Sequence, residues 1–99
     1  MKSANHFLLF IFGSSPINDR AETHFRALAQ RAFADDYELE IIDILHHPDQ
    51  AEKYRILAAP TLVRLSPDPP VKIVGDLSSA IRLRQILGLP VGHDLEHAR

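Results

Sequence analysis

The segment APTLVRLSPDPPVKIVG, residues 59–75, is the most informative part of the sequence for the fold. Pro60 disfavours helical geometry at the residue before it, and residues 61–65 are rich in side chains that favour strands. Residues 66–70 contain three prolines, a serine and an aspartate, which is typical of a turn. Residues 71–74 then alternate and stop at a glycine. The segment therefore predicts an antiparallel hairpin of two strands.

Upstream of this hairpin, the sequence predicts an apolar strand followed by an amphipathic helix. Residues 6–12, HFLLFIF, are apolar on both faces, as expected of a strand that is covered on both sides. After a loop, Pro16 suits a first helical turn, and Ser15 or Asn18 can cap the helix. Apolar residues then recur at spacings of three and four as far as Ala34, where we expect the helix to end.

A second strand and two further helices complete the predicted order of elements. Residues 37–45 favour a strand, and residues 49–57 are rich in helix formers with acidic residues near their start. A last helix is expected between Ser78, its cap, and Gly88, its left-handed terminator. The order is βαβαββα, an α/β fold with a mixed central sheet, because a strand-helix-strand unit implies a parallel crossover and the hairpin is antiparallel.

The composition excludes several classes of function. A chain of 99 residues holds one domain, which we expect over residues 1–90, with a flexible tail over 91–99. The net charge of -2 argues against a nucleic-acid partner, and the absence of cysteine excludes thiol chemistry and disulfides. The longest apolar run, residues 7–12, is far shorter than the roughly 20 residues of a membrane span. We therefore predict a cytoplasmic protein with no membrane partner.

Part of the chain resembles the thioredoxin family. The series Ala59-Pro60-Thr61-Leu62, followed by a hairpin and a closing helix, is similar to the thioredoxin segment in which a cis-proline precedes a strand. Residues 13–16 read GSSP at the place where that family carries its Cys-x-x-Cys site. The resemblance implies a thioredoxin-like fold without the active site, and it makes Pro60 the candidate for a structural cis-proline.

Nearly the whole chain resembles the KaiB family of small circadian clock proteins. The resemblance rests on the ordered series DILHHPDQAEKYRILAAPTLVRLSPDPPVKIVGDLS, residues 43–78, and residues 6–34 fit more loosely. The chain departs from the family at Asp68, where the family usually has another proline. A basic pair of the family is also reduced here to Lys72.

The KaiB resemblance implies a binding protein with neither enzymatic activity nor a cofactor. It implies docking on a KaiC-type ATPase, a RecA-like hexamer whose phosphorylation cycle it modulates, and self-association to a dimer or tetramer. It also implies fold switching, in which the chain repacks from the thioredoxin-like order to a βαββααβ ground state. We expect four basic residues to contribute to ATPase docking: Arg20, Arg55, Arg64 and Lys72. The alternative is a KaiB-like stress-response or signalling module with no clock role.

Other patterns in the sequence have simpler interpretations than a site. His93 and His97 have a spacing that suits a metal on a helix, but they lie in the expected tail. Residues 46–47, two histidines, and residues 35–36, two aspartates, are expected in a loop and a turn. The loop at residues 13–18 lacks the glycines and the lysine of a phosphate loop, and its serines have no apparent base. We therefore predict neither a metal site nor a catalytic residue.

Overall fold

The computed structural model describes residues 4–75, 77–78 and 80–88. The predicted βαβαββα order is confirmed in this part of the chain. The expected tail, with His93 and His97, lies outside the described residues. The elements along the chain are β1 (His6–Ile11), α1 (Pro16–Phe33), β2 (Glu38–Asp43), α2 (Pro48–Lys53), β3 (Thr61–Ser66), β4 (Val71–Val74) and α3 (Ala80–Leu87).

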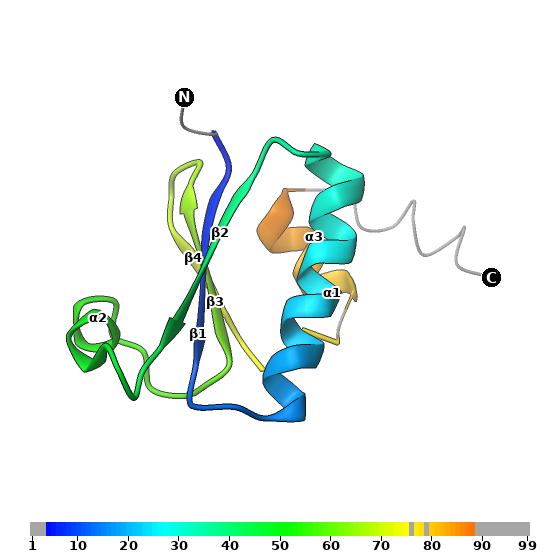
Figure 1. The fold of residues 1–99 in the computed structure, drawn as a ribbon. Coiled ribbons are helices and arrows are strands. Elements are labelled where there is room, and N and C mark those ends of the chain that lie inside the picture. Colours follow the sequence, from blue (N-terminus) through cyan, green and yellow to red (C-terminus); the bar gives the residue numbers. More distant parts are fainter. Residues whose placement is uncertain (1–3, 76, 79, 89–99) are drawn as a thin grey trace.

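The strands form one mixed sheet with the order β2-β1-β3-β4. β1 pairs with β2 in parallel, whereas β1 with β3 and β3 with β4 are antiparallel, which confirms the predicted hairpin. Helices α1 and α3 lie together on one side of this sheet, and α2 lies on the other side near the ends of β1 and β2 (Figure 1). The fold therefore has three layers of unequal size, because α2 has only six residues.

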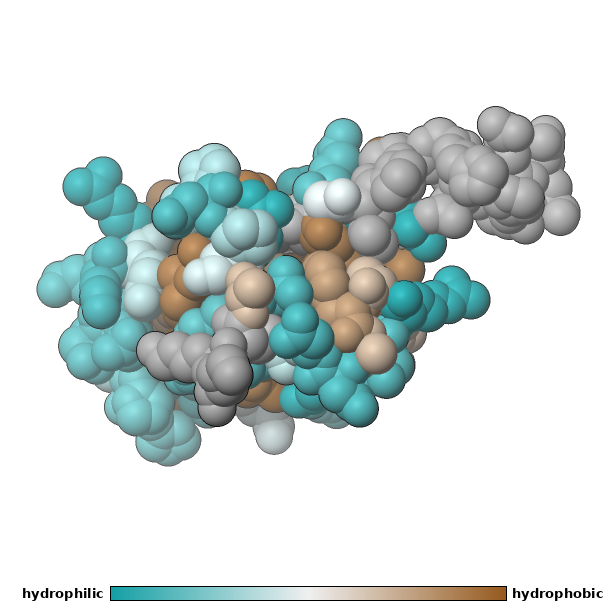
Figure 2. Space-filling view, turned by 90° about the horizontal axis from the view of Figure 1, so that it is seen from above, coloured by the Kyte–Doolittle hydropathy of each residue, from teal (hydrophilic) through white to brown (hydrophobic). Residues whose placement is uncertain are grey.

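The larger part of the core lies between the sheet and helices α1 and α3. Phe7 of β1 and Phe25 of α1 are fully buried, and their ring centroids are 4.8 Å apart in an edge-on arrangement. Tyr37 adds a second edge-on contact to the Phe25 ring at 5.8 Å. When the molecule is seen from the top of Figure 1, apolar residues lie toward the middle of the view and hydrophilic residues lie around its rim (Figure 2). Apolar side chains at helical spacing thus dock α1 on the sheet, as its sequence predicts.

The other face of the sheet carries a smaller cluster. Leu8, Phe10, Ile42 and Val63 are its buried members. The segment that follows α2 covers this cluster, and the ring of its Tyr54 lies 5.9 Å from the ring of Phe10. Burial on both faces explains why the sequence of β1 shows no alternation of apolar and polar residues.

The second helix is shorter than predicted. We expected it over residues 49–57, but α2 ends at Lys53. The backbone turns at Arg55, which has a φ of 55°, and the N–H of Ile56 donates back to the carbonyl of Ala51 at 2.8 Å. This turn brings Ile56 against the sheet. Tertiary packing has therefore overridden the helix propensity of the segment.

The remaining boundaries are close to the predicted ones. Gly88 follows α3 with a φ of 76°, as expected of a left-handed terminator. The peptide bond between Ala59 and Pro60 is cis, and the bonds preceding Pro67 and Pro69 are also cis. Within the described ranges, no helix combines the length and the apolar character that a membrane span requires.

Candidate docking surface

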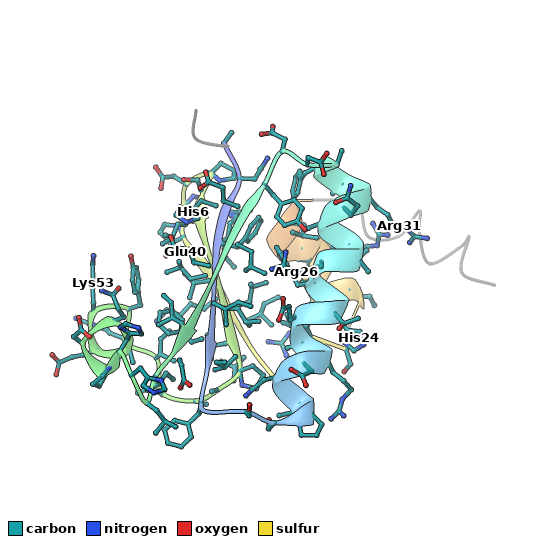
Figure 3. The ribbon with its side chains drawn as sticks, viewed as in Figure 1. His6, His24, Arg26, Arg31, Glu40 and Lys53 are labelled. Carbon is teal, nitrogen blue, oxygen red and sulfur yellow. The ribbon has the colours of Figure 1, made fainter. Side chains whose placement is uncertain are left out.

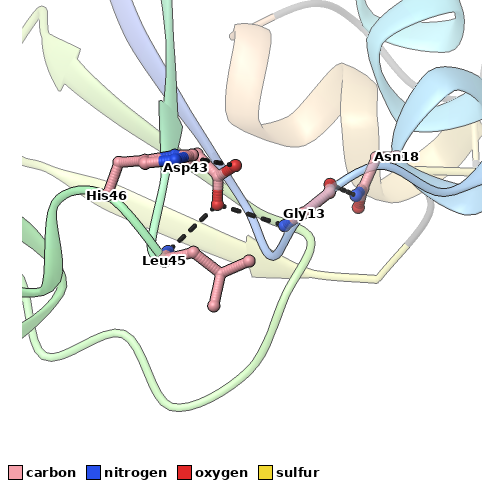
Figure 4. A network of polar contacts seen from close by, with 5 residues as sticks. All are labelled: Gly13, Asn18, Asp43, Leu45 and His46. Atoms are coloured by element: carbon pink, nitrogen blue, oxygen red, sulfur yellow. Dashed lines mark hydrogen bonds and ion pairs between the residues drawn. The ribbon is translucent and has the colours of Figure 1, made fainter.

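The carboxyl ends of the two parallel strands are held together by Asp43. Its Oδ1 accepts hydrogen bonds from the N–H of Gly13 at 3.1 Å and from the N–H of Leu45 at 3.0 Å (Figure 4). The ring nitrogen Nδ1 of His46 lies 3.4 Å from the other carboxylate oxygen. A single side chain thereby fixes the loop after β1 and the loop after β2.

The electrostatics of Asp43 follow from these contacts. The Gly13 N–H lowers the pKa of the Asp43 carboxyl below its usual value; desolvation opposes this shift, and the Leu45 N–H and the His46 ring add to it. The carboxylate is therefore the stable form at neutral pH, where it serves as a hydrogen-bond acceptor. Among the described residues, no group of three His, Cys, Asp or Glu side chains lies close enough together to hold a metal ion.

The loop after β1 is occupied by capping interactions. The Ser15 hydroxyl accepts a bond from the N–H of Asn18 at 3.5 Å, so Ser15 is the N-cap of α1 and Pro16 occupies the first turn. Asn18, the other predicted cap, is buried instead, and its Nδ2 donates to the carbonyl of Gly13 at 2.7 Å. This loop corresponds to the one that carries the redox site in thioredoxins, but here its polar groups have a structural role.

Two of the four predicted docking residues are held by contacts within the hairpin and the segment before it. Lys72 of β4 donates from Nζ to the carbonyls of Tyr54 at 2.7 Å and Arg55 at 3.3 Å. Arg64 of β3 donates from Nη2 to the carbonyl of Pro69 at 2.9 Å, across the turn of the hairpin.

The other two predicted docking residues, Arg20 and Arg55, are exposed, and so is the side chain of Lys72. Arg20 lies on α1 and Arg55 follows α2, so the sheet separates them (Figure 1). Of the four predicted docking residues, Arg55 and Lys72 are brought into contact, through the carbonyl of Arg55. Arg64 points to the face of the sheet opposite Lys72, since it pairs with Phe7 and Val71 in register.

Exposed apolar side chains accompany these charges. Phe12 is 60% exposed and directly follows β1, and Leu45 is 56% exposed and lies two residues beyond the end of β2. Leu57, in the segment after α2, is 97% exposed. On the same side of the sheet as α2, His6 Nε2 lies 3.1 Å from an oxygen of Glu40. Arg31, by comparison, lies on the other side of the sheet and points outward from α1 (Figure 3). The α2 side thus combines apolar and charged groups on short, exposed segments.

Comparison with known proteins places this chain in a family. Residues 8–89 match the KaiB domain. The chain belongs to the KaiB family. The circadian clock oscillator protein KaiB of Prochlorococcus marinus is 42% identical over 81 residues, which cover 82% of this chain and 68% of that protein. The circadian clock oscillator protein KaiB1 of Synechocystis sp. is 37% identical over 86 residues, which cover 87% of this chain and 80% of that one.

Solved structures show the same fold at lower sequence identity. The N-terminal domain of SasA from Synechococcus elongatus superposes with a TM-score of 0.72 at 21% identity, covering 89% of this chain and 87% of that domain. Mitochondrial thioredoxin 3 from Saccharomyces cerevisiae superposes with a TM-score of 0.69 at 22% identity, covering 88% of this chain and 80% of the thioredoxin. The described residues of this KaiB-family chain therefore adopt a thioredoxin-like fold, as the sequence predicts.

Two features of this surface have no clear signal in the sequence. Asp43 reads as the last polar position of a strand, and only its place before a turn hints at the backbone contacts that it makes. The contact of Lys72 with residues 54 and 55 joins positions that are 18 and 17 residues apart, so no local pattern reveals it.

Proposed function

We propose that this KaiB-family protein is a non-enzymatic adaptor of a circadian clock, which binds a KaiC-type hexameric ATPase in the cytoplasm and modulates its phosphorylation cycle. The observation that carries the proposal is the similarity to circadian clock oscillator proteins over more than four fifths of the chain. The continuous match to the KaiB domain over residues 8–89 adds support, because it spans every strand and all three helices apart from the first residues of β1.

The absence of catalysis is part of the proposal. Its support is the loop at residues 13–16, which reads GSSP and contains no thiol. The Ser15 hydroxyl accepts a bond from the first turn of α1, so it acts as a helix cap. An enzyme-like thioredoxin relative would need a nucleophile and a base at this place.

Fold switching and self-association belong to the same proposal. We infer that the described thioredoxin-like state binds the ATPase, and that a βαββααβ ground state forms a dimer or tetramer. Such a switch requires two packings whose free energies differ by only a few kcal/mol. The short elements α2 and α3, with six and eight residues, support this view because little helix has to be lost on repacking. We also propose that residues 1–90 are the folded unit and that 91–99 form a tail.

Direct docking falls to two of the four predicted residues. Arg20 and Arg55 carry charges on exposed side chains, which favours contact with an acidic surface of the partner. Arg64 and Lys72 donate to backbone carbonyls of this chain, so we assign them an indirect part in docking.

The test is complex formation with a KaiC-type hexamer in the presence of ATP, measured by size-exclusion chromatography with light scattering. We expect a complex that forms slowly from the full chain. Arg20→Glu and Arg55→Glu should each weaken it by reversing a docking charge. Arg31→Glu is the matched control, because Arg31 is also exposed on α1 but is not among the predicted docking residues. Equal binding by all three variants would reject the assignment of the docking charges.

A KaiB-like stress-response or signalling module with no clock role is the second candidate. The reduction of the basic pair to Lys72 favours it, because one cation for an acidic ATPase surface has been lost. If the wild-type chain forms no complex with the hexamer at high concentration, this second function becomes the better assignment.

A further inference from the structure

Lys72 extends from β4 to a segment on the α2 side of the sheet. It pairs in register with Val63, whose buried side chain belongs to the cluster on that side, so the two side chains share this face. From there its ammonium group donates to the carbonyl of Tyr54 at 2.7 Å and to that of Arg55 at 3.3 Å. Lys72 is thus a bridge between the hairpin and the chain that follows α2.

Tyr54 is the C-cap residue of α2, so its carbonyl is one of the last helical carbonyls, and the carbonyl of Arg55 follows directly. The last carbonyls of a helix have no partner within the helix, and they form the negative end of its dipole. The chain also adopts a left-handed conformation at Arg55, with a φ of 55°, where a residue other than glycine is strained. A cation that binds both carbonyls stabilises this strained exit from α2.

The segment held in this way alternates between buried and exposed side chains. Tyr54 and Ile56 pack on the cluster that contains Phe10. Arg55 and Leu57 point outward, and Leu57 is almost fully exposed. The direction in which these two side chains project depends on the backbone that Lys72 holds.

We propose that Lys72 is a positioning residue that fixes the segment 54–57 and thereby the direction in which Arg55 and Leu57 are presented to a partner. Its effect on docking rests on the proposed function, but the contact itself does not. Lys72 acts through the backbone carbonyls and not by an ion pair with an acidic partner surface. Its loss therefore loosens the segment in the free protein and weakens binding to a similar extent at low and high salt.

Hydrogen exchange on the free, full-length chain tests the contact. The N–H groups of Tyr54, Arg55 and Ile56 are all bonded to carbonyls of α2, so their exchange reports the stability of the turn. Lys72→Met keeps the aliphatic stem and removes the donor, and we expect about fivefold faster exchange of these amides. Lys72→Arg keeps a charged donor and should restore most of the protection. Amides of α1 should exchange at the wild-type rate, which shows that the fold is intact.

A neighbouring lysine provides the matched control. Lys53 has its Nζ 5.3 Å from the centre of the Tyr54 ring, so it touches the same segment without contacting the two carbonyls. Lys53→Met should leave the exchange of residues 54–56 unchanged. Unchanged exchange in Lys72→Met, or an equal increase in Lys53→Met, would overturn the proposal.

Binding to the KaiC-type hexamer at two salt concentrations tests the consequence. Lys72→Met should weaken the complex by a similar factor at both concentrations, whereas the effect of Arg55→Glu should shrink at high salt because it is a direct charge effect. A loss in Lys72→Met that vanishes at high salt would overturn the positioning role. Failure of the wild-type chain to bind would count against the proposed function alone, and the exchange experiment would still decide the role of Lys72.

Discussion

The carboxylate of Asp43 and the backbone of Gly13 connect the ends of the two parallel strands. Oδ1 of Asp43, the last residue of β2, accepts a bond from the N–H of Gly13 at 3.1 Å, two residues beyond the end of β1. The same oxygen accepts a hydrogen bond from the N–H of Leu45, so one atom contacts both loops. These loops present Phe12 and Leu45, the exposed apolar residues at this edge of the sheet.

Removing the Asp43 carboxylate should loosen both loops. We expect Asp43→Ala to lower the melting temperature on the order of 5 °C, since two N–H groups lose their acceptor in a domain of about 100 residues. Asp43→Asn keeps an oxygen acceptor and should lose less. Thermal melts measure the stability, and amide chemical shifts of Gly13 and Leu45 locate the change. Wild-type melting and wild-type shifts in Asp43→Ala would contradict this role.

The contribution of Asp43 should also depend on pH. Hydrogen bonding, first of all from Gly13, lowers the pKa of its carboxyl in the folded state, so the carboxylate stabilises the fold above the unfolded value of about 3.9. This contribution is lost as the pH falls through the lower, folded pKa. The difference in melting temperature between wild type and Asp43→Asn should therefore be constant above about pH 5 and shrink below about pH 4.

Thermal melts between about pH 2.5 and 7 measure this dependence. Asp68→Asn is the control, because Asp68 is an exposed carboxylate in the turn between β3 and β4. This variant removes one negative charge without changing the contacts of Asp43 with Gly13 and Leu45, so it controls for the loss of a carboxylate as such. A difference for Asp43→Asn that stays constant down to about pH 2.5 would refute the linkage.

The order of elements and the sheet were predictable because their signals are local. An apolar run over residues 6–11, a cap at Ser15 and the prolines of residues 66–70 each determine structure within a few neighbouring residues. The end of α2 was predicted wrongly for the opposite reason. Its position depends on the packing of Tyr54 and Ile56 against residues that are remote in sequence, such as Phe10.

The candidate surface was less predictable than the fold. The sequence identifies basic residues, and the structure leaves Arg20 and Arg55 exposed as a docking role requires. The sequence alone does not reveal that the charge of Lys72 is directed to two backbone carbonyls, since this contact exists only after β4 has paired with β3. Nor does the identity of Asp43 indicate which N–H groups will donate hydrogen bonds to its side chain.

Phe25 should be among the most sensitive positions of the core. Its side chain is fully buried and makes edge-on ring contacts with Phe7 and Tyr37. Phe25→Ala should reduce the free energy of unfolding by about 3–5 kcal/mol, and Phe25→Leu should cost less because it leaves a smaller cavity. Urea denaturation measures both. Phe12→Ala is the control, since this exposed ring should change the free energy by no more than about 0.5 kcal/mol.

Gly13 should resist substitution mainly because of its backbone conformation. It has a φ of 69°, which costs a residue with a side chain about 1–2 kcal/mol. A Cβ atom there would also lie 3.3 Å from Cδ1 of Leu45, a tight contact that this partly exposed side chain relieves by a small shift. We therefore expect Gly13→Ala to lower the free energy of unfolding by about 1–2 kcal/mol, measured by urea denaturation.

A double-mutant cycle separates backbone strain from the contact with Leu45. If strain dominates, Gly13→Ala should cost the same within about 0.5 kcal/mol in the wild type and in a Leu45→Ala background. Gly13→Asn should cost less than Gly13→Ala, because asparagine tolerates the left-handed conformation better. A cost that disappears in the Leu45→Ala background would instead assign the effect to the side-chain contact, and the glycine would then be required for space and not for its φ.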